Sequence, residues 1–185
     1  MGLHKVNDLA HVSIRDDYER VKSARPNMRA RDIARELHIS EAELLCSRIG
    51  QEIIKLEGDW AELIRLTPSL GRVMALTRND SCVHEKHGEY DNISIGPGHG
   101  LVLNKDIDLR LFMSHWHFGF AVSEVVSSGK RHSLQFFDID GEAIHKIYMP
   151  KGNNLEAYKA IVNKFRSPDQ TEKILIHKLP DGKKD

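Results

Sequence analysis

Histidines are concentrated in one stretch of this chain, between residues 78 and 117. Five of the 11 histidines lie there: His84, His87, His99, His115 and His117. Imidazole is a common metal ligand, and its ordinary pKa lies close to neutral pH. The same stretch holds Arg110, a single arginine inside an apolar run. Imidazoles beside a fixed positive charge suit a ligand that combines a metal centre with anionic groups.

Two of these side chains are candidates for binding such a ligand, and each also has a structural interpretation. His84 could ligate a metal, or it could be satisfied by Glu85 or by the backbone. Arg110 could bind an anion, because a lone arginine in an apolar strand usually meets one. It could equally pair with Asp108 or Glu124.

The other histidines give weaker signals. His99 lies in a Gly-Pro-Gly-His-Gly turn and could be a ligand or only a turn residue. His115 and His117 have a His-x-His spacing that occurs in zinc sites, although no third ligand is fixed by spacing. His132 and His145 are most simply residues of an exposed sheet face.

The composition indicates a soluble single domain without a nucleic-acid or membrane partner. The chain has 185 residues, 40% of them hydrophobic, and its 27 basic and 27 acidic side chains cancel. The two cysteines, Cys46 and Cys82, are far apart, which fits a reducing cytoplasm. No apolar run has the length of a signal peptide or a membrane span. We therefore expect a cytoplasmic protein.

Helical periodicity dominates the first 70 residues. Residues 1–13 lack periodicity and are expected to form a flexible arm. Helices are predicted over 14–24, over two segments within 28–49, and over 60–66. Ser40 and Glu43 form a capping box that opens the second helix of the pair. Another amphipathic helix is predicted at 153–165.

From Gly71 the period changes to two, which predicts strands. The expected strands cover residues 72–77, 82–86, 90–95, 101–103, 107–113, 116–126, 132–137 and 143–148. Because short turns join them, they should form an antiparallel meander. The predicted fold is α+β, with a domain over 14–166 that divides into a helical part (14–70), a sheet (71–150) and a closing helix (153–166). A polar tail over 167–185 could add one short strand.

Alternation along these strands predicts which side chains share a face. Arg110 and Phe112 should lie opposite the apolar face of their strand. His115 and His117 should lie opposite a shared face of Trp116, Phe118 and Phe120. One sheet face could therefore collect histidines, an arginine and aromatic surface, which suits a flat apolar ligand with anionic groups and a metal centre.

The helix pair within 28–49 also matches a helix–turn–helix pattern. The second helix would present Glu41 and Glu43 at the end where a recognition helix meets phosphates. These acids disfavour DNA binding. A nucleic-acid partner is therefore not expected.

Several motifs in this chain resemble the HemS/ChuS-type cytoplasmic haem-utilisation proteins of Gram-negative bacteria. The resemblance runs from about Tyr18 to Phe165, which is too extended for one chance motif. It is carried by Gly88, Tyr90, Trp116 and residues 31–34, 39–44, 47–48, 78–79, 83–85, 98–101, 103–104, 108–112, 131–138 and 145–148.

The resemblance implies a haem ligand and candidate contacts for it. The HemS/ChuS-type proteins are tandem repeats, and this chain resembles their N-terminal unit alone, so half of the tandem fold is expected. Arg110 matches an arginine on the distal side of haem, and His84 matches a histidine implicated in some members. His99 lies near a glycine-flanked histidine of the related single-unit ChuX/HutX-type carriers. Because those carriers dimerise to imitate the tandem fold, a homodimer is implied.

Three functions remain open under this resemblance. The first is a haem carrier that receives imported haem and passes it on for iron release, with a haem importer or a haem oxygenase as partner. The second is an enzyme that opens the porphyrin by reductive or oxygenase-type chemistry. No Gly-x-Gly-x-x-Gly fingerprint is present, which favours the carrier. The third is a helix–turn–helix regulator that responds to haem.

Overall fold

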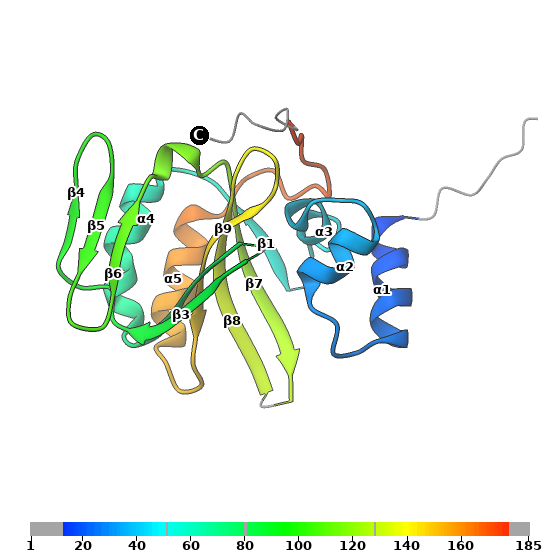
Figure 1. Ribbon diagram of the computed structural model, residues 1–185, viewed down its shortest axis with the longest axis horizontal. Helices are drawn as coiled ribbons and strands as arrows, with labels where there is room; N and C mark the ends of the chain where they lie inside the picture. The colour runs from blue at the N-terminus through cyan, green and yellow to red at the C-terminus, as the bar shows by residue number, and fades with distance from the viewer. Residues whose placement is uncertain (1–12, 51, 80, 128, 178–185) are drawn as a thin grey trace, which may run out of the picture.

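The computed structural model describes residues 13–50, 52–79, 81–127 and 129–177 (Figure 1). The predicted arm lies outside these residues except for Ser13. The helices are α1 (Ile14–Ala24), α2 (Ala30–Glu36), α3 (Glu41–Cys46), α4 (Trp60–Leu66) and α5 (Leu155–Phe165), with 3-10 turns η1 (Thr67–Leu70) and η2 (Met113–His115). None of the described helices combines the length and the hydropathy that a bilayer crossing requires.

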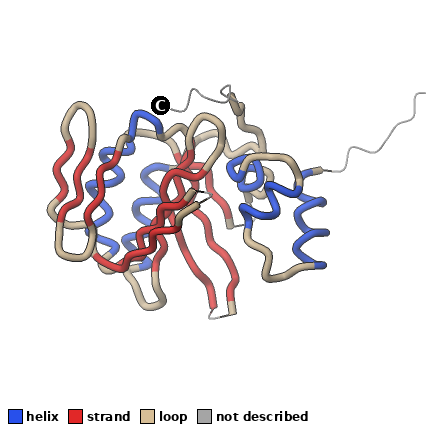
Figure 2. The backbone as a smooth tube through the Cα atoms, in the orientation of Figure 1, coloured by secondary structure: helices blue, strands red, loops and turns tan. Residues whose placement is uncertain are grey.

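The strands form two antiparallel sheets (Figure 2). The strands are β1 (Ile53–Leu56), β2 (Val73–Arg78), β3 (Val83–Gly88), β4 (Ile93–Ile95), β5 (Gly100–Leu103), β6 (Asp108–Leu111), β7 (Phe118–Val126), β8 (Gly129–Phe137) and β9 (Ala143–Met149). The large sheet has the order β1-β7-β8-β9-β2-β3, and the small sheet has the order β4-β5-β6. The predicted α+β fold, with N-terminal helices, a large antiparallel sheet and a C-terminal helix, is confirmed.

The path of the chain through the sheet departs from a simple meander. β7, β8 and β9 follow one another as predicted, but β9 next pairs with β2, which places Leu76 opposite Lys146. β1 was not predicted, and it closes the other edge beside β7. Within the described residues 167–177 the tail forms no named strand. Short turns specify only neighbours in the chain, whereas these long-range pairs depend on which faces are buried together.

Helices cover both faces of the large sheet (Figure 1). α4 and α5 pack on one face around Phe136 and Ile147, and α3 packs on the other around Phe120 and Phe137. Trp116 belongs to the first cluster and Phe120 to the second, so the prediction that they share a face is wrong. The cause is η2, which replaces the end of an expected strand and shifts the phase of the alternation before β7.

Helix α3 is a packing element. Five of its six residues are buried, and the Ser40–Glu43 capping box that opens it is present as predicted. Glu41, 5% exposed, forms an ion pair with Lys146 of β9, which is 6% exposed. A recognition helix needs an exposed face to enter the major groove. The buried face of α3 therefore does not favour the regulator hypothesis.

Candidate functional site

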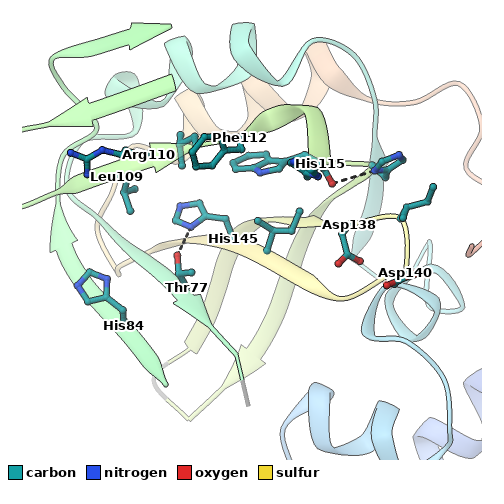
Figure 3. A pocket seen from close by; sticks show the side chains of 14 residues that line it. Thr77, His84, Leu109, Arg110, Phe112, His115, Asp138, Asp140 and His145 are labelled. Carbon is teal, nitrogen blue, oxygen red and sulfur yellow. Dashed lines mark hydrogen bonds between the residues drawn. The ribbon is translucent and has the colours of Figure 1, made fainter. Parts of the chain in front are cut away.

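A cavity of about 570 Å³ opens on the face of the large sheet that α4 and α5 cover elsewhere (Figure 3). Its floor comes from β2, β3 and β9, and its opposite wall from β6 and the turn η2. Its side chains include three of the histidines from the stretch 78–117, together with Arg110. The lining residues are Thr77, His84, Leu109, Arg110, Leu111, Phe112, His115, Trp116, His117, Asp138, Ile139, Asp140, Ile144 and His145.

The register of the β2–β3 hairpin brings His84 into the cavity. Thr77 and His84 are directly opposite each other, so both side chains lie on the same face. His84 is exposed, and its imidazole makes no hydrogen bond to Glu85 or to any other described residue. Its imidazole is therefore available to a ligand.

His145 forms the inner part of the floor and is 2% exposed. Its Nε2 lies 2.5 Å from the hydroxyl oxygen of Tyr90, and its Nδ1 lies 3.0 Å from Oγ1 of Thr77. The Trp116 ring stacks against it with a centroid separation of 6.0 Å. Burial lowers the pKa of His145 to about 4, so the imidazole is neutral at physiological pH.

The prediction that His145 is an exposed sheet residue is therefore wrong. Along β9, His145 shares its face with Ile147 and Met149, both buried. That alternation was a signal that could have placed the imidazole in the interior. It was outweighed by the assumption that a polar residue in an antiparallel sheet faces water.

Arg110 projects from β6 beside Phe112. The Arg110 side chain is 63% exposed, and its nearest carboxylate is Asp108, with 3.4 Å between Nη1 and Oδ1. Glu124, the other predicted partner, pairs with Arg131. Because an exposed ion pair of this length contributes little, the guanidinium is available to an anionic ligand. Phe112 is 53% exposed and extends the apolar wall.

His115 and His117 flank the end of η2, and both line the cavity. Nδ1 of His117 lies 3.2 Å from the carbonyl oxygen of His115. Within the described residues, no group of three histidine, cysteine or acidic side chains is placed to hold a metal ion. The spacing alone therefore does not define a zinc site here.

His99 lies outside this cavity. It lines a smaller hollow of about 320 Å³, beside the 96–98 turn and Trp60. Its ring is 6.1 Å from that of Phe112, which belongs to the main cavity. Of the predicted ligand contacts, the structure thus brings together His84 and Arg110 but not His99.

His84 and Arg110 lie at one end of the cavity, and Asp138 and Asp140 lie at the other (Figure 3). The apolar part of the lining comes from Leu109, Phe112, Ile144 and the ring of Trp116. An open slot with apolar walls and a cationic end suits a flat apolar molecule that carries negative groups.

Comparison with known proteins agrees with this chemistry. The chain is 39% identical over 160 residues to the hemin transport protein HmuS of Yersinia pestis, a match that covers 86% of this chain and 46% of HmuS. The structure of holo-PhuS, a heme-binding protein from Pseudomonas aeruginosa, superposes with a TM-score of 0.86 at 37% identity, over 90% of this chain and 49% of PhuS. The heme degrading enzyme ChuS of Escherichia coli O157:H7 gives a TM-score of 0.81 at 31% identity, over 91% of this chain and 52% of ChuS.

This chain therefore spans about half the length of the relatives that it matches. The model of one protein family, described as the haemin-degrading HemS.ChuX domain, matches residues 38–165. That segment contains all of the cavity and all the named strands of both sheets. The chain belongs to the HemS/ChuX family of haem-utilisation proteins.

Proposed function

We propose that the cavity binds haem and that the protein is a haem carrier, which receives imported haem in the cytoplasm and passes it on for iron release. The observation that carries this proposal is the convergence of His84, Arg110 and Phe112 on one slot with apolar walls. Haem is flat and apolar, carries two propionates, and accepts imidazole nitrogen on its iron. The slot offers a complement to each of these features.

Each side chain has a separate proposed role. His84 is the candidate iron ligand, because its imidazole is exposed and projects from the floor. Arg110 stands on the opposing wall, where its fork of donors could hold a water on iron or pair with a propionate. His99 is the second candidate iron ligand, and its ring lies next to that of Phe112. His115 and His117 line the wall beyond the apolar section.

A haemin titration followed by absorption spectroscopy tests the proposal. We expect native protein to give a stoichiometric Soret band, and His84→Ala to shift the band and weaken haemin binding at least tenfold, because the axial ligand is lost. Arg110→Ala should weaken binding a few-fold. The matched controls are His87→Ala, on the same strand but outside the cavity, and Arg65→Ala, an exposed arginine of α4.

The outcomes separate the candidates. A Soret band that survives His84→Ala but is lost in His99→Ala would transfer the ligand role to His99. Native protein that gives no Soret change beyond free haemin would contradict haem binding by this chain. Equal weakening by His87→Ala and His84→Ala would show that the effect is not specific to the cavity.

Haem degradation is the second candidate function. The family description and the name of the relative ChuS both refer to it. The same titration decides between the two functions when ascorbate, or NADH with a reductase, is added to the loaded protein. Decay of the Soret band with release of iron would make the protein an enzyme, whereas a stable band is expected for a carrier.

A carrier also needs a source and a recipient of haem. We extend the proposal to a homodimer that accepts haem from an importer and delivers it to a haem oxygenase. Transfer is testable by mixing loaded protein with apo-oxygenase and following the Soret band of each protein after separation. Retention of all haem by the carrier would contradict delivery.

A further inference from the structure

A second and larger cavity, of about 1040 Å³, lies on the opposite face of the large sheet, beneath helices α1–α3. Adjacent residues of the same strand line different cavities. Thr77 and His145 line the first, whereas Arg78 and Lys146 line the second. Because successive side chains of a strand point to opposite faces, the two cavities are independent.

Two arginines that line the second cavity each have a buried Nε atom without a hydrogen-bond acceptor among the described residues. In the described part of the chain, Nε of Arg48 and Nε of Arg78 are the buried side-chain donors that are left without an acceptor, and both residues line this cavity. Burying a charged donor without an acceptor costs free energy. Their convergence on one cavity indicates where an acceptor would bind.

The protein's own carboxylates do not fill this role. Three glutamates of the cavity are already engaged, in the pairs Glu41–Lys146, Glu52–Lys130 and Glu124–Arg131. The other two, Glu19 and Glu85, form no ion pair with Arg48 or Arg78 among the described residues. The Arg48 guanidinium instead lies over the Tyr18 ring, 4.1 Å from its centroid.

We propose that this second cavity binds an organic dianion, with one carboxylate group held by Arg48 and the other by Arg78. The Nε edge of a guanidinium presents two parallel donors that match a carboxylate. The cavity is far larger than an inorganic ion, and Tyr18, Leu76 and Val83 supply apolar surface for a carbon skeleton. A ligand here would also bridge the helical layer and the sheet, since Arg48 follows α3 and Arg78 ends β2.

Calorimetric titration of the full chain with citrate and with glutarate tests this proposal. We expect binding of one anion per chain, and about tenfold weaker binding in Arg48→Gln and in Arg78→Gln, because each variant removes a charged hydrogen-bonding pair. Arg78→Lys should also weaken binding, since the charge remains but the fork is lost. Arg65→Gln, an exposed arginine outside both cavities, is the matched control and should bind like native protein.

Thermal unfolding gives a second readout that does not depend on the heat of binding. Without ligand, Arg78→Gln should melt no lower than native protein, because a buried Nε donor without an acceptor has been removed. With citrate, the melting temperature of native protein should rise and that of Arg78→Gln should not. A large loss of ligand-free stability in Arg78→Gln would contradict the idea that the buried Nε of Arg78 lacks an acceptor.

Other outcomes would also overturn the proposal. The absence of binding by both acids would do so, as would equal binding in the two arginine variants and in Arg65→Gln. Acetate or inorganic phosphate that bound as tightly as citrate would indicate an adventitious ion only. Haemin titrations of Arg48→Gln and Arg78→Gln should match native protein, so a shared loss of haem affinity would contradict the independence of the two cavities.

Discussion

Burial determines where the hydrogen atoms lie in the network formed by Tyr90, His145 and Thr77. Tyr90 is fully buried, and among the described residues its hydroxyl has Nε2 of His145 as its partner, so the hydroxyl donates to Nε2. The neutral imidazole then carries its single hydrogen on Nδ1 and donates it to Oγ1 of Thr77. The Thr77 hydroxyl keeps its own hydrogen for water or for a ligand in the first cavity.

This network predicts a loss of stability in weak acid. The pKa of His145 is about 4 in the folded protein and near 6.5 in the unfolded chain. Between these values the unfolded chain binds more protons, so the free energy of unfolding falls as the pH decreases through this window, by about 3 kcal/mol in total. Above pH 6.5 this group contributes no pH dependence.

Chemical denaturation at several pH values between 7 and 4 measures this effect. In His145→Gln, the part of the pH dependence that comes from this group should disappear. His87→Ala should keep it, because His87 is exposed on the edge strand β3. Equal slopes for His145→Gln and native protein would show that the imidazole is not the group responsible.

The candidate ligand contacts were easier to propose from the sequence than the buried histidine. Residue type and strand alternation pointed to Arg110 and His84, and the resemblance to the HemS/ChuS-type proteins supplied most of the support for them. His145 was missed because its partners, Thr77 and Tyr90, are 68 and 55 residues away in sequence. The alternation along β9 could have placed the imidazole in the interior, but no local pattern identifies partners so distant in the sequence.

Close packing between α4 and β7 positions Trp116 in the wall of the first cavity. Trp60 at the start of α4 donates from Nε1 to the Trp116 carbonyl oxygen at 2.8 Å, and its ring meets Phe136 edge-on. The indole occupies the space beside Gly119 of β7, where an added Cβ would lie 2.5 Å from Cη2 of Trp60. Only glycine lets α4 approach the sheet this closely.

Gly119→Ala should therefore destabilise the protein by about 1–3 kcal/mol, because the indole must move and its hydrogen bond must distort. Since Trp116 lines the cavity, haemin affinity should fall as well. Gly98→Ala is the control, because a Cβ at that position meets no atom within 4 Å. If unfolding curves showed native stability for both variants, they would contradict the close packing of Trp60 against Gly119.

The helices were easier to predict than the edges of the sheet. Capping residues and apolar stripes are local, and the Ser40–Glu43 capping box opened α3 where expected. β1 has only four residues and follows the α3 turn without an alternating pattern, so nothing in its own sequence identified it. Its place beside β7 is fixed by burial of Ile53 and Leu56 in different core clusters on the two faces.

At the scale of the whole molecule, one sheet separates two cavities of different character. The face shared with α4 and α5 carries the histidine-rich slot, and the face shared with α1–α3 carries the arginine-rich cavity. β9 and β2 contribute to both through alternate residues. A ligand in either cavity thus contacts the same two strands.

The first cavity is open on one side, and this opening favours a homodimer. Phe112 is 53% exposed at the rim, so haem bound by one copy would retain a partly exposed apolar surface. A second copy placed over this rim would bury both that surface and the Phe112 ring. Because such a dimer holds haem better than a monomer does, haemin should in turn stabilise the dimer.

Sedimentation velocity tests this linkage directly. We expect a species of twice the 21.1 kDa chain mass, in a fraction that increases when haemin is added. Phe112→Ser should lower that fraction, whereas Val125→Ser should not, because Val125 is 84% exposed on the far side of the sheet. A monomer at every concentration, with and without haemin, would exclude the dimer and leave the haem slot of a single chain open on one side.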